Sequence, residues 1–261
     1  MMRATTLLAL SIFAAATCAQ LRADDHPIDG VLPADASIDR VLDALNERGK
    51  PPTEFIAKVS DATIDTSVGT DQKHTGMIWF SRQSPTRLRL HVLFDKVIVG
   101  HVIQNQKREY LLDGEWLTAR SYDAIKTETK YQVMKPGEKK DLMKLGAGTF
   151  PLPIGQDKDD VKKAFDVTKV APAKDDPPQA IHLTLTPRPG TDLAKKFTSI
   201  DIWVDRGSHM PVVIDTLSDS EEHRVEMKEI QVNPNPPLSD KDFTLPDVDS
   251  SWNLKTEAYG S

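Results

Sequence analysis

The stretch GMIWFSR, residues 76–82, constrains the fold of this chain more than any other. Side chains alternate between the two faces of a β-strand, so Met77 and Trp79 load one face with large apolar groups. Ile78 and Phe80 do the same on the other face. A strand needs only one apolar face to build a core. This one is therefore sandwiched between two layers, or one face meets a layer absent from the sequence, and lipid is such a layer in an exported protein.

The N-terminal residues 1–23 have the pattern of a secretory signal peptide. Arg3 supplies an early positive charge, an apolar run follows at residues 7–16, and Ala19 and Ala23 offer cleavage sites. The run is shorter than the roughly 20 residues of a membrane-spanning helix. We expect cleavage and a periplasmic location; the alternative is a buried N-terminal helix.

Cys18 is the only cysteine of the chain. Cleavage after it would leave a mature protein without thiol or disulfide chemistry. The preceding residues, Ala15-Ala16-Thr17, form a poor version of the site at which bacterial lipoproteins are cut and acylated on cysteine. Lipid anchoring at Cys18 therefore stays open as the less favoured alternative.

Length and charge indicate one domain without affinity for polyanions. The 261 residues leave room, after the signal peptide, for one domain over residues 34–248, followed by a flexible C-terminal tail at 249–261. The net charge is -6 and the basic residues are spread along the chain, which argues against nucleic-acid binding.

One amphipathic helix precedes the strands. Within residues 32–50, apolar side chains recur at i, i+3, i+4 and i+7 from Ile38 to Leu45, and Gly49 with the prolines after it ends the helix. A second helical turn is expected at residues 159–164.

Alternating apolar and polar residues predict many strands with short turns, including a tight hairpin at Asp113-Gly114. Such regular strands with few helices favour a mainly β (α+β) fold built on a large, curved antiparallel sheet. Besides residues 76–82, the predicted strands are 55–59, 87–94, 97–104, 110–112, 116–117, 131–133, 181–185, 200–204, 212–214, 225–232 and 243–246.

The segment LGAGTFPLPIGQ, residues 145–156, combines flexible glycines with Phe150, Leu152 and Ile154 between prolines. This composition is typical of a loop rather than a strand. One interpretation is a loop packed over the core. The other is a lid over an apolar cavity, because a lid needs hinges and an apolar underside.

No motif indicates catalysis. The seven histidines are isolated from one another, and His91, His182 and His223 occupy the polar phase of strands, where we expect them to be solvated. The acidic runs at 157–160 and 247–249 lack the pattern of a calcium loop and are interpreted as solvated turns. We expect no enzyme, cofactor or metal; an enzyme built from carboxylates on distant strands is a distant alternative.

The order of these elements resembles the periplasmic lipoprotein carrier LolA, between Asp35 and about Pro246. The resemblance rests on the leading helix, the lid-like insertion and the order of four short motifs. These are a G-x-[LI]-W-[VF]-x-R strand with Gly76, Trp79 and Arg82; LTPR at residues 185–188; Phe197 with Ile200; and FTLP at residues 243–246.

The resemblance implies an incomplete antiparallel β-barrel with an N-terminal amphipathic helix and a short helical lid over an apolar cavity for acyl chains. The resemblance implies that such a carrier accepts lipoproteins from an inner-membrane lipoprotein-releasing transporter and delivers them to an outer-membrane acceptor as a monomer. An alternative on the same fold is a non-enzymatic module that senses or binds lipid or lipoprotein, either regulatory or as a membrane-anchored acceptor.

The resemblance also implies a site. In the family, the arginine that ends the tryptophan-containing strand matters for lipoprotein uptake and release, and Arg82 occupies that position. The family has proline directly after this arginine, whereas Gln83-Ser84 precede Pro85 here, and a plain surface arginine is the alternative. The expected lipid- or cargo-binding residues are Arg82, Trp79, Met77, Leu88, Leu90, Phe150, Leu152 and Ile154.

Overall fold

The structure is a computed structural model that describes residues 30–65, 71–84, 86–135, 137–138, 142 and 154–259. The predicted signal peptide, with Cys18, lies outside these residues. No helix in the described part is both long and apolar enough to cross a membrane. The elements are α1 (Ile38–Arg48), β1 (Thr53–Asp65), β2 (Asp71–Ser84), β3 (Arg87–Val99), β4 (Val102–Asp113), β5 (Trp116–Ser121), β6 (Thr127–Gln132), α2 (Lys158–Ala164), β7 (Phe165–Lys169), β8 (Ala180–Pro187), β9 (Ser199–Asp205), β10 (Pro211–Leu217), β11 (Glu221–Val232), the 3-10 helix η1 (Asp240–Phe243) and β12 (Asn253–Glu257).

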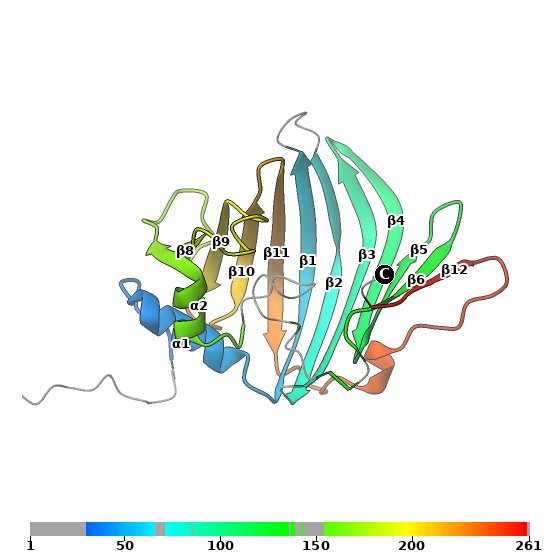
Figure 1. The fold of residues 1–261 in the computed structure, drawn as a ribbon, viewed down its shortest axis with the longest axis horizontal. Helices are drawn as coiled ribbons and strands as arrows, with labels where there is room; N and C mark the ends of the chain where they lie inside the picture. Colours follow the sequence, from blue (N-terminus) through cyan, green and yellow to red (C-terminus); the bar gives the residue numbers. More distant parts are fainter. Residues whose placement is uncertain are drawn as a thin grey trace, which may run out of the picture.

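The strands form one 12-stranded sheet in the order β12-β6-β5-β4-β3-β2-β1-β11-β10-β9-β8-β7. Neighbouring strands are antiparallel except for the parallel pair β12 and β6. The sheet is curved and does not close, because β12 and β7 stay at its two edges (Figure 1). The mainly β fold and the incomplete barrel expected from the sequence are therefore confirmed.

Helix α1 follows its predicted pattern. The Ser37 side chain caps its first turn by accepting a hydrogen bond from the Arg40 amide, and Gly49 ends it with its amide bonded to the last carbonyls. Its apolar stripe, which includes Leu45, is buried. Figure 1 shows α1 and α2 in front of the half of the sheet that contains β8–β10.

The register gives the sheet two distinct faces. We call the face that packs on α1 the inner face and the opposite one the outer face. Directly paired residues make a continuous apolar row on the inner face, from β1 across to β5, and all of its members are buried. This inner row consists of Phe55, Phe80, Leu90, Leu112 and Leu117.

Three expectations about local structure are wrong. Residues 97–104 do not form one strand, because Gly100 adopts a positive φ of 57° and turns the chain between β3 and β4. The FTLP segment is not a strand, since η1 ends at Phe243 and extended backbone without a sheet partner follows. Beyond Asp249, residues 253–257 are not a loose tail but form β12.

Candidate functional site

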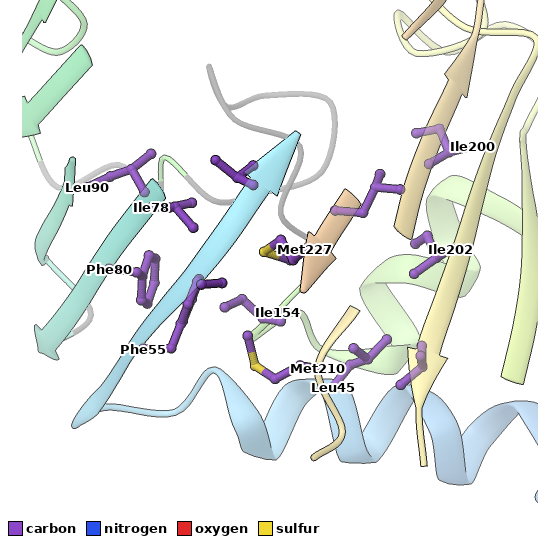
Figure 2. Packing of buried hydrophobic residues seen from close by; sticks show 14 of the residues in the cluster. Leu45, Phe55, Ile78, Phe80, Leu90, Ile154, Ile200, Ile202, Met210 and Met227 are labelled. Atoms are coloured by element: carbon purple, nitrogen blue, oxygen red, sulfur yellow. The ribbon is translucent and has the colours of Figure 1, made fainter. Parts of the chain in front are cut away.

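The inner face carries the buried apolar core of the described residues. The rings of Phe55 and Phe80 stack with their centroids 4.8 Å apart. Figure 2 shows these rings with Ile78 and Leu90 on one side of the core and Ile200 and Ile202 on the other, above α1. The apolar residues of the Trp-containing strand that face this core are thus Ile78 and Phe80. Burial of these side chains away from water stabilises the fold.

The described residues between β6 and α2 lie over this face, and we call them the covering segment. Met134, Leu142 and Ile154 belong to the same buried cluster as the inner row. Ile154 is only 1% exposed and lies between Met227 and Met210, beside Phe55, in Figure 2. The described end of the predicted lid therefore packs on the core. Phe150, Leu152 and the remainder of residues 145–153 lie outside the described residues.

Arg82 points to the inner side rather than to solvent. It is 6% exposed, and its Nη1 donates a hydrogen bond of 3.1 Å to the carbonyl of Gly49, at the end of α1. A methyl group added to Gly155 would come within 2.5 Å of the same Nη1, so the guanidinium lies tightly between the two glycines. The alternative of a plain surface arginine is wrong, although Gln83-Ser84 separate Arg82 from Pro85.

The same junction ties the covering segment to α1. The amide of Gly155 donates a hydrogen bond of 3.0 Å to the carbonyl of Leu45, in the last turn of the helix. Gly155 adopts a positive φ of 73°, a conformation that glycine reaches without steric cost. Arg82, α1 and the end of the covering segment are therefore mechanically connected.

The expected site residues divide between the two faces. Leu88 lies opposite Arg82 and Leu90 opposite Phe80, so both belong to the inner face together with Arg82 and Ile154. Met77 and Trp79 lie on the outer face, away from that cluster. The alternation rule requires this, because neighbours of the inward Ile78 and Phe80 must point outward.

Trp79 takes part in a polar network on the outer face. Its ring stacks on His91 with the centroids 5.0 Å apart. The His91 Nε2 lies 3.1 Å from the carboxylate of Glu109, and its Nδ1 lies 2.7 Å from the backbone carbonyl of Asp242. Burial alone would raise the pKa of Glu109, but hydrogen bonds from His91 and Tyr122 and the nearby charge of Lys107 lower it to about 2.

The C-terminal segment, residues 239–257, lies over this network. Arg89 pairs with Asp240 at 2.7 Å and stacks over the ring of Phe243 at 4.3 Å. The rings of Trp252 and Tyr122 make a T-shaped contact with the centroids 4.9 Å apart. Arg120 and Glu128 form a further buried pair at 2.6 Å.

The expectation that the three strand histidines are solvated is wrong for two of them. His91 is buried under the C-terminal segment, and His182 stacks on Trp203 at 3.9 Å and pairs with Asp201. His223 is partly exposed and pairs with Asp61. Their alternation along the strands correctly predicted that these histidines point to the outer face. It could not predict their burial, because the residues that cover them are distant in sequence.

No protein-family model and no curated protein matches this sequence. Solved structures similar to it include the MucA/MucB complex of Pseudomonas aeruginosa, with 12% identity over 80% of this chain and 60% of that chain, at a TM-score of 0.43. This chain thus spans less than two thirds of that one. LprF from Mycobacterium bovis has 10% identity over 77% of this chain and 94% of that chain, at a TM-score of 0.37. The LolA superfamily protein NE2245 from Nitrosomonas europaea has 12% identity over 80% of this chain and 98% of that chain, at a TM-score of 0.28.

Proposed function

We propose that this protein is a periplasmic carrier that holds the acyl chains of lipoproteins or other lipids on its inner face. The inner row supports the proposal most directly, because five strands in succession present a buried apolar side chain at the same level. A sheet with two unpaired edges can widen, whereas a closed barrel cannot change its circumference without breaking a ladder.

Hydrocarbon chains explain why a carrier would be needed. Each methylene group transferred out of water contributes about 0.8 kcal/mol. Two or three acyl chains exposed to water therefore cost roughly 20–35 kcal/mol by the same increment. Release through bulk water would be very slow. A protein that shields the chains and passes them from surface to surface avoids that barrier.

The residues that cover the inner face supply the step that would open it. Ile154 and Met134 occupy apolar surface that an acyl chain could take over. Their displacement would strain the junction at which Gly155 bonds to α1 and Arg82 bonds to Gly49. In this proposal Arg82 positions the covering segment and thereby controls the uptake and release of acyl chains. The protein acts by binding, without catalysis.

The proposed route runs from an inner-membrane lipoprotein-releasing transporter to an outer-membrane acceptor. The alternative is a sensing or binding module of the same fold. A transfer assay between donor and acceptor membranes separates the two. A carrier moves labelled lipoprotein between them, whereas a module that binds lipid without moving it would support the alternative.

Neighbouring residues on opposite faces of β5 provide the test of the binding face. A photo-reactive benzoylphenylalanine replaces Leu117, in the inner row, or Thr118, which points to the outer face. After irradiation in the periplasm, mass spectrometry should find acyl-bearing adducts for the variant at Leu117 and none for the one at Thr118. Leu88, also on the inner face, is a second position in case the first variant folds poorly. Absence of acyl adducts at both inner positions, or equal adducts at Thr118, would contradict the proposal.

A further inference from the structure

A groove of about 430 Å³ lies on the outer face, across β11, β1, β2 and β3. This volume is within the range of small-molecule sites in proteins. The groove is separated from the inner face by the thickness of the sheet, because Lys58, Thr75 and Met77 alternate along their strands with residues of the inner face. It is lined by Lys58, Val59, Ser60, Lys73, Thr75, Gly76, Met77, Leu93, Asp95, Lys96, Glu226 and Lys228.

Two β-bulges border the groove. On β11, Glu229 and Ile230 stand opposite the single residue Ala57 of β1, and Glu229 has a positive φ of 52°. On β3, Asp95 has no partner between the pairs that Phe94 and Lys96 make with β2. Bulges bend a strand and re-aim its side chains, and they are common next to binding sites. The groove is therefore a consequence of how these strands are paired.

Gly76, which lines the groove, marks a close approach of two strands. A methyl group added to Gly76 would lie 1.8 Å from the carbonyl oxygen of Leu93 on the next strand. No side chain larger than hydrogen fits there, so β2 and β3 approach each other closely at this level. A Gly in a strand interior often marks such a close approach.

The lysines of the groove are arranged in a way that stability does not explain. Lys58 and Lys228 lie directly opposite each other on paired strands, and like charges in this position destabilise a sheet. Two glutamates offset part of this repulsion. Glu229 lies 2.5 Å from Lys58, and Glu226 lies 3.5 Å from Lys228. Concentrating positive charge here, in a chain with a net charge of -6, indicates an anionic ligand.

The other lysines extend the positive charge around the groove. Lys73 lies 3.6 Å from Glu226, which it shares with Lys228. Lys96 makes no ion pair with any residue in the described part of the chain. It lies opposite Thr75, which in turn lies opposite Ser60, so two hydroxyl groups stand between Lys96 and Glu226 on β11. Lysines and hydroxyls together are suitable donors for a phosphate group.

The groove also has an apolar end. Met77 lies opposite Lys58 on one side and Leu93 on the other, and both apolar side chains are partly exposed. We propose that the outer groove is a second binding site, separate from the inner face, for an amphipathic phosphate: the phosphate on the lysines and hydroxyls, and the start of a hydrocarbon chain on Met77 and Leu93. This role for Met77 does not depend on the carrier function.

Calorimetric titration with dihexanoyl phosphatidic acid, below the concentration at which it forms micelles, tests the site. We expect saturable binding by the full mature chain. The double variant Lys58→Gln/Lys228→Gln should bind at least tenfold more weakly, with an unchanged or higher melting temperature because the like-charge pair is gone. The matched control, Lys50→Gln/Lys195→Gln, removes the same charge from exposed lysines elsewhere and should bind like the wild type.

Two further ligands test the chemistry of the site. Glycerol 3-phosphate carries the phosphate without the chains and should bind more weakly than dihexanoyl phosphatidic acid. The Met77→Ala variant should show a smaller difference in affinity between these two ligands. Dihexanoyl phosphatidylcholine, whose headgroup has no net charge, should not compete. The proposal would be overturned if phosphatidic acid did not bind, or if it bound equally well to Lys58→Gln/Lys228→Gln. It would also be overturned if the control Lys50→Gln/Lys195→Gln lost as much affinity, or if glycerol 3-phosphate bound as tightly as phosphatidic acid.

Discussion

Arg82 links three parts of the molecule that are distant in sequence. Its guanidinium lies between Gly49, at the end of α1, and Gly155, at the end of the covering segment, while its backbone belongs to β2. A buried guanidinium that bonds a helix-terminal carbonyl both satisfies that carbonyl and fixes the helix end. A change at this residue should therefore loosen the contact between α1 and Gly155 more than it perturbs the sheet.

We expect Arg82→Leu to fold and to alter lipoprotein release. Loss of a hydrogen bond from a charged donor costs about 1.5–3 kcal/mol, a part of the stability of an ordinary domain. Urea unfolding gives the stability, and transfer of labelled lipoprotein from a donor membrane to an acceptor gives the function. Arg87→Leu, at an exposed position on β3, is the control. Unchanged transfer by the Arg82 variant would remove this residue from the mechanism.

At the scale of elements, the C-terminal segment is a structural part of the sheet. Strand β12 pairs with β6, so β12 rather than β6 forms this edge of the sheet. η1 places Phe243 under the guanidinium of Arg89, and Trp252 packs on Tyr122. The segment thus excludes water from the charged pairs of the outer face, which strengthens them.

Replacing Trp252 by alanine should loosen this segment. An edge-to-face aromatic contact contributes about 0.5–1.5 kcal/mol beyond the area it buries. We expect faster cleavage after residue 239 in limited proteolysis and a lower melting temperature. Trp116→Ala, at an exposed tryptophan that makes no aromatic contact within the described residues, serves as the comparison. Equal proteolysis of the two variants would show that Trp252 does not hold the segment.

The elements differ in how far the sequence predicts them. Helix α1 was predictable because its periodicity and its cap are local. Strand β12, NLKTE, has only one large apolar residue and takes its structure from β6, more than 100 residues earlier. The turn at Gly100 interrupts a run of apolar residues whose alternation continues past it. Of the site residues, Leu88, Leu90 and Arg82 come together as expected, whereas the lysine groove requires knowledge of the strand register.

At the scale of the whole molecule, one continuous sheet connects two halves. The pair β1 and β11 joins strands β1–β6 to strands β7–β11. Both halves contribute to one buried cluster, in which Phe80 and Ile202 are members. A shared core makes the two halves stabilise each other, although chains of this size often unfold in more than one step.

The shared core predicts cooperative unfolding. Hydrogen exchange followed by mass spectrometry at increasing urea concentration reports on β3–β5 and β8–β10 separately in the unmodified protein. We expect both groups of strands to lose protection at the same urea concentration. Loss of protection in one group at clearly lower urea would show that the halves are separate folding units joined at β1 and β11.

The sequence alone determined the leading helix, most strands and the two apolar faces of residues 76–82, because all of these depend on the period of side chains along a local segment. Only the tertiary structure decided which face is which. Ile78 and Phe80 join the core because α1 and the segment ending at Ile154 pack on that side. Met77 and Trp79 then face outward, beside the lysine groove and under the C-terminal segment, through contacts between residues far apart in the chain.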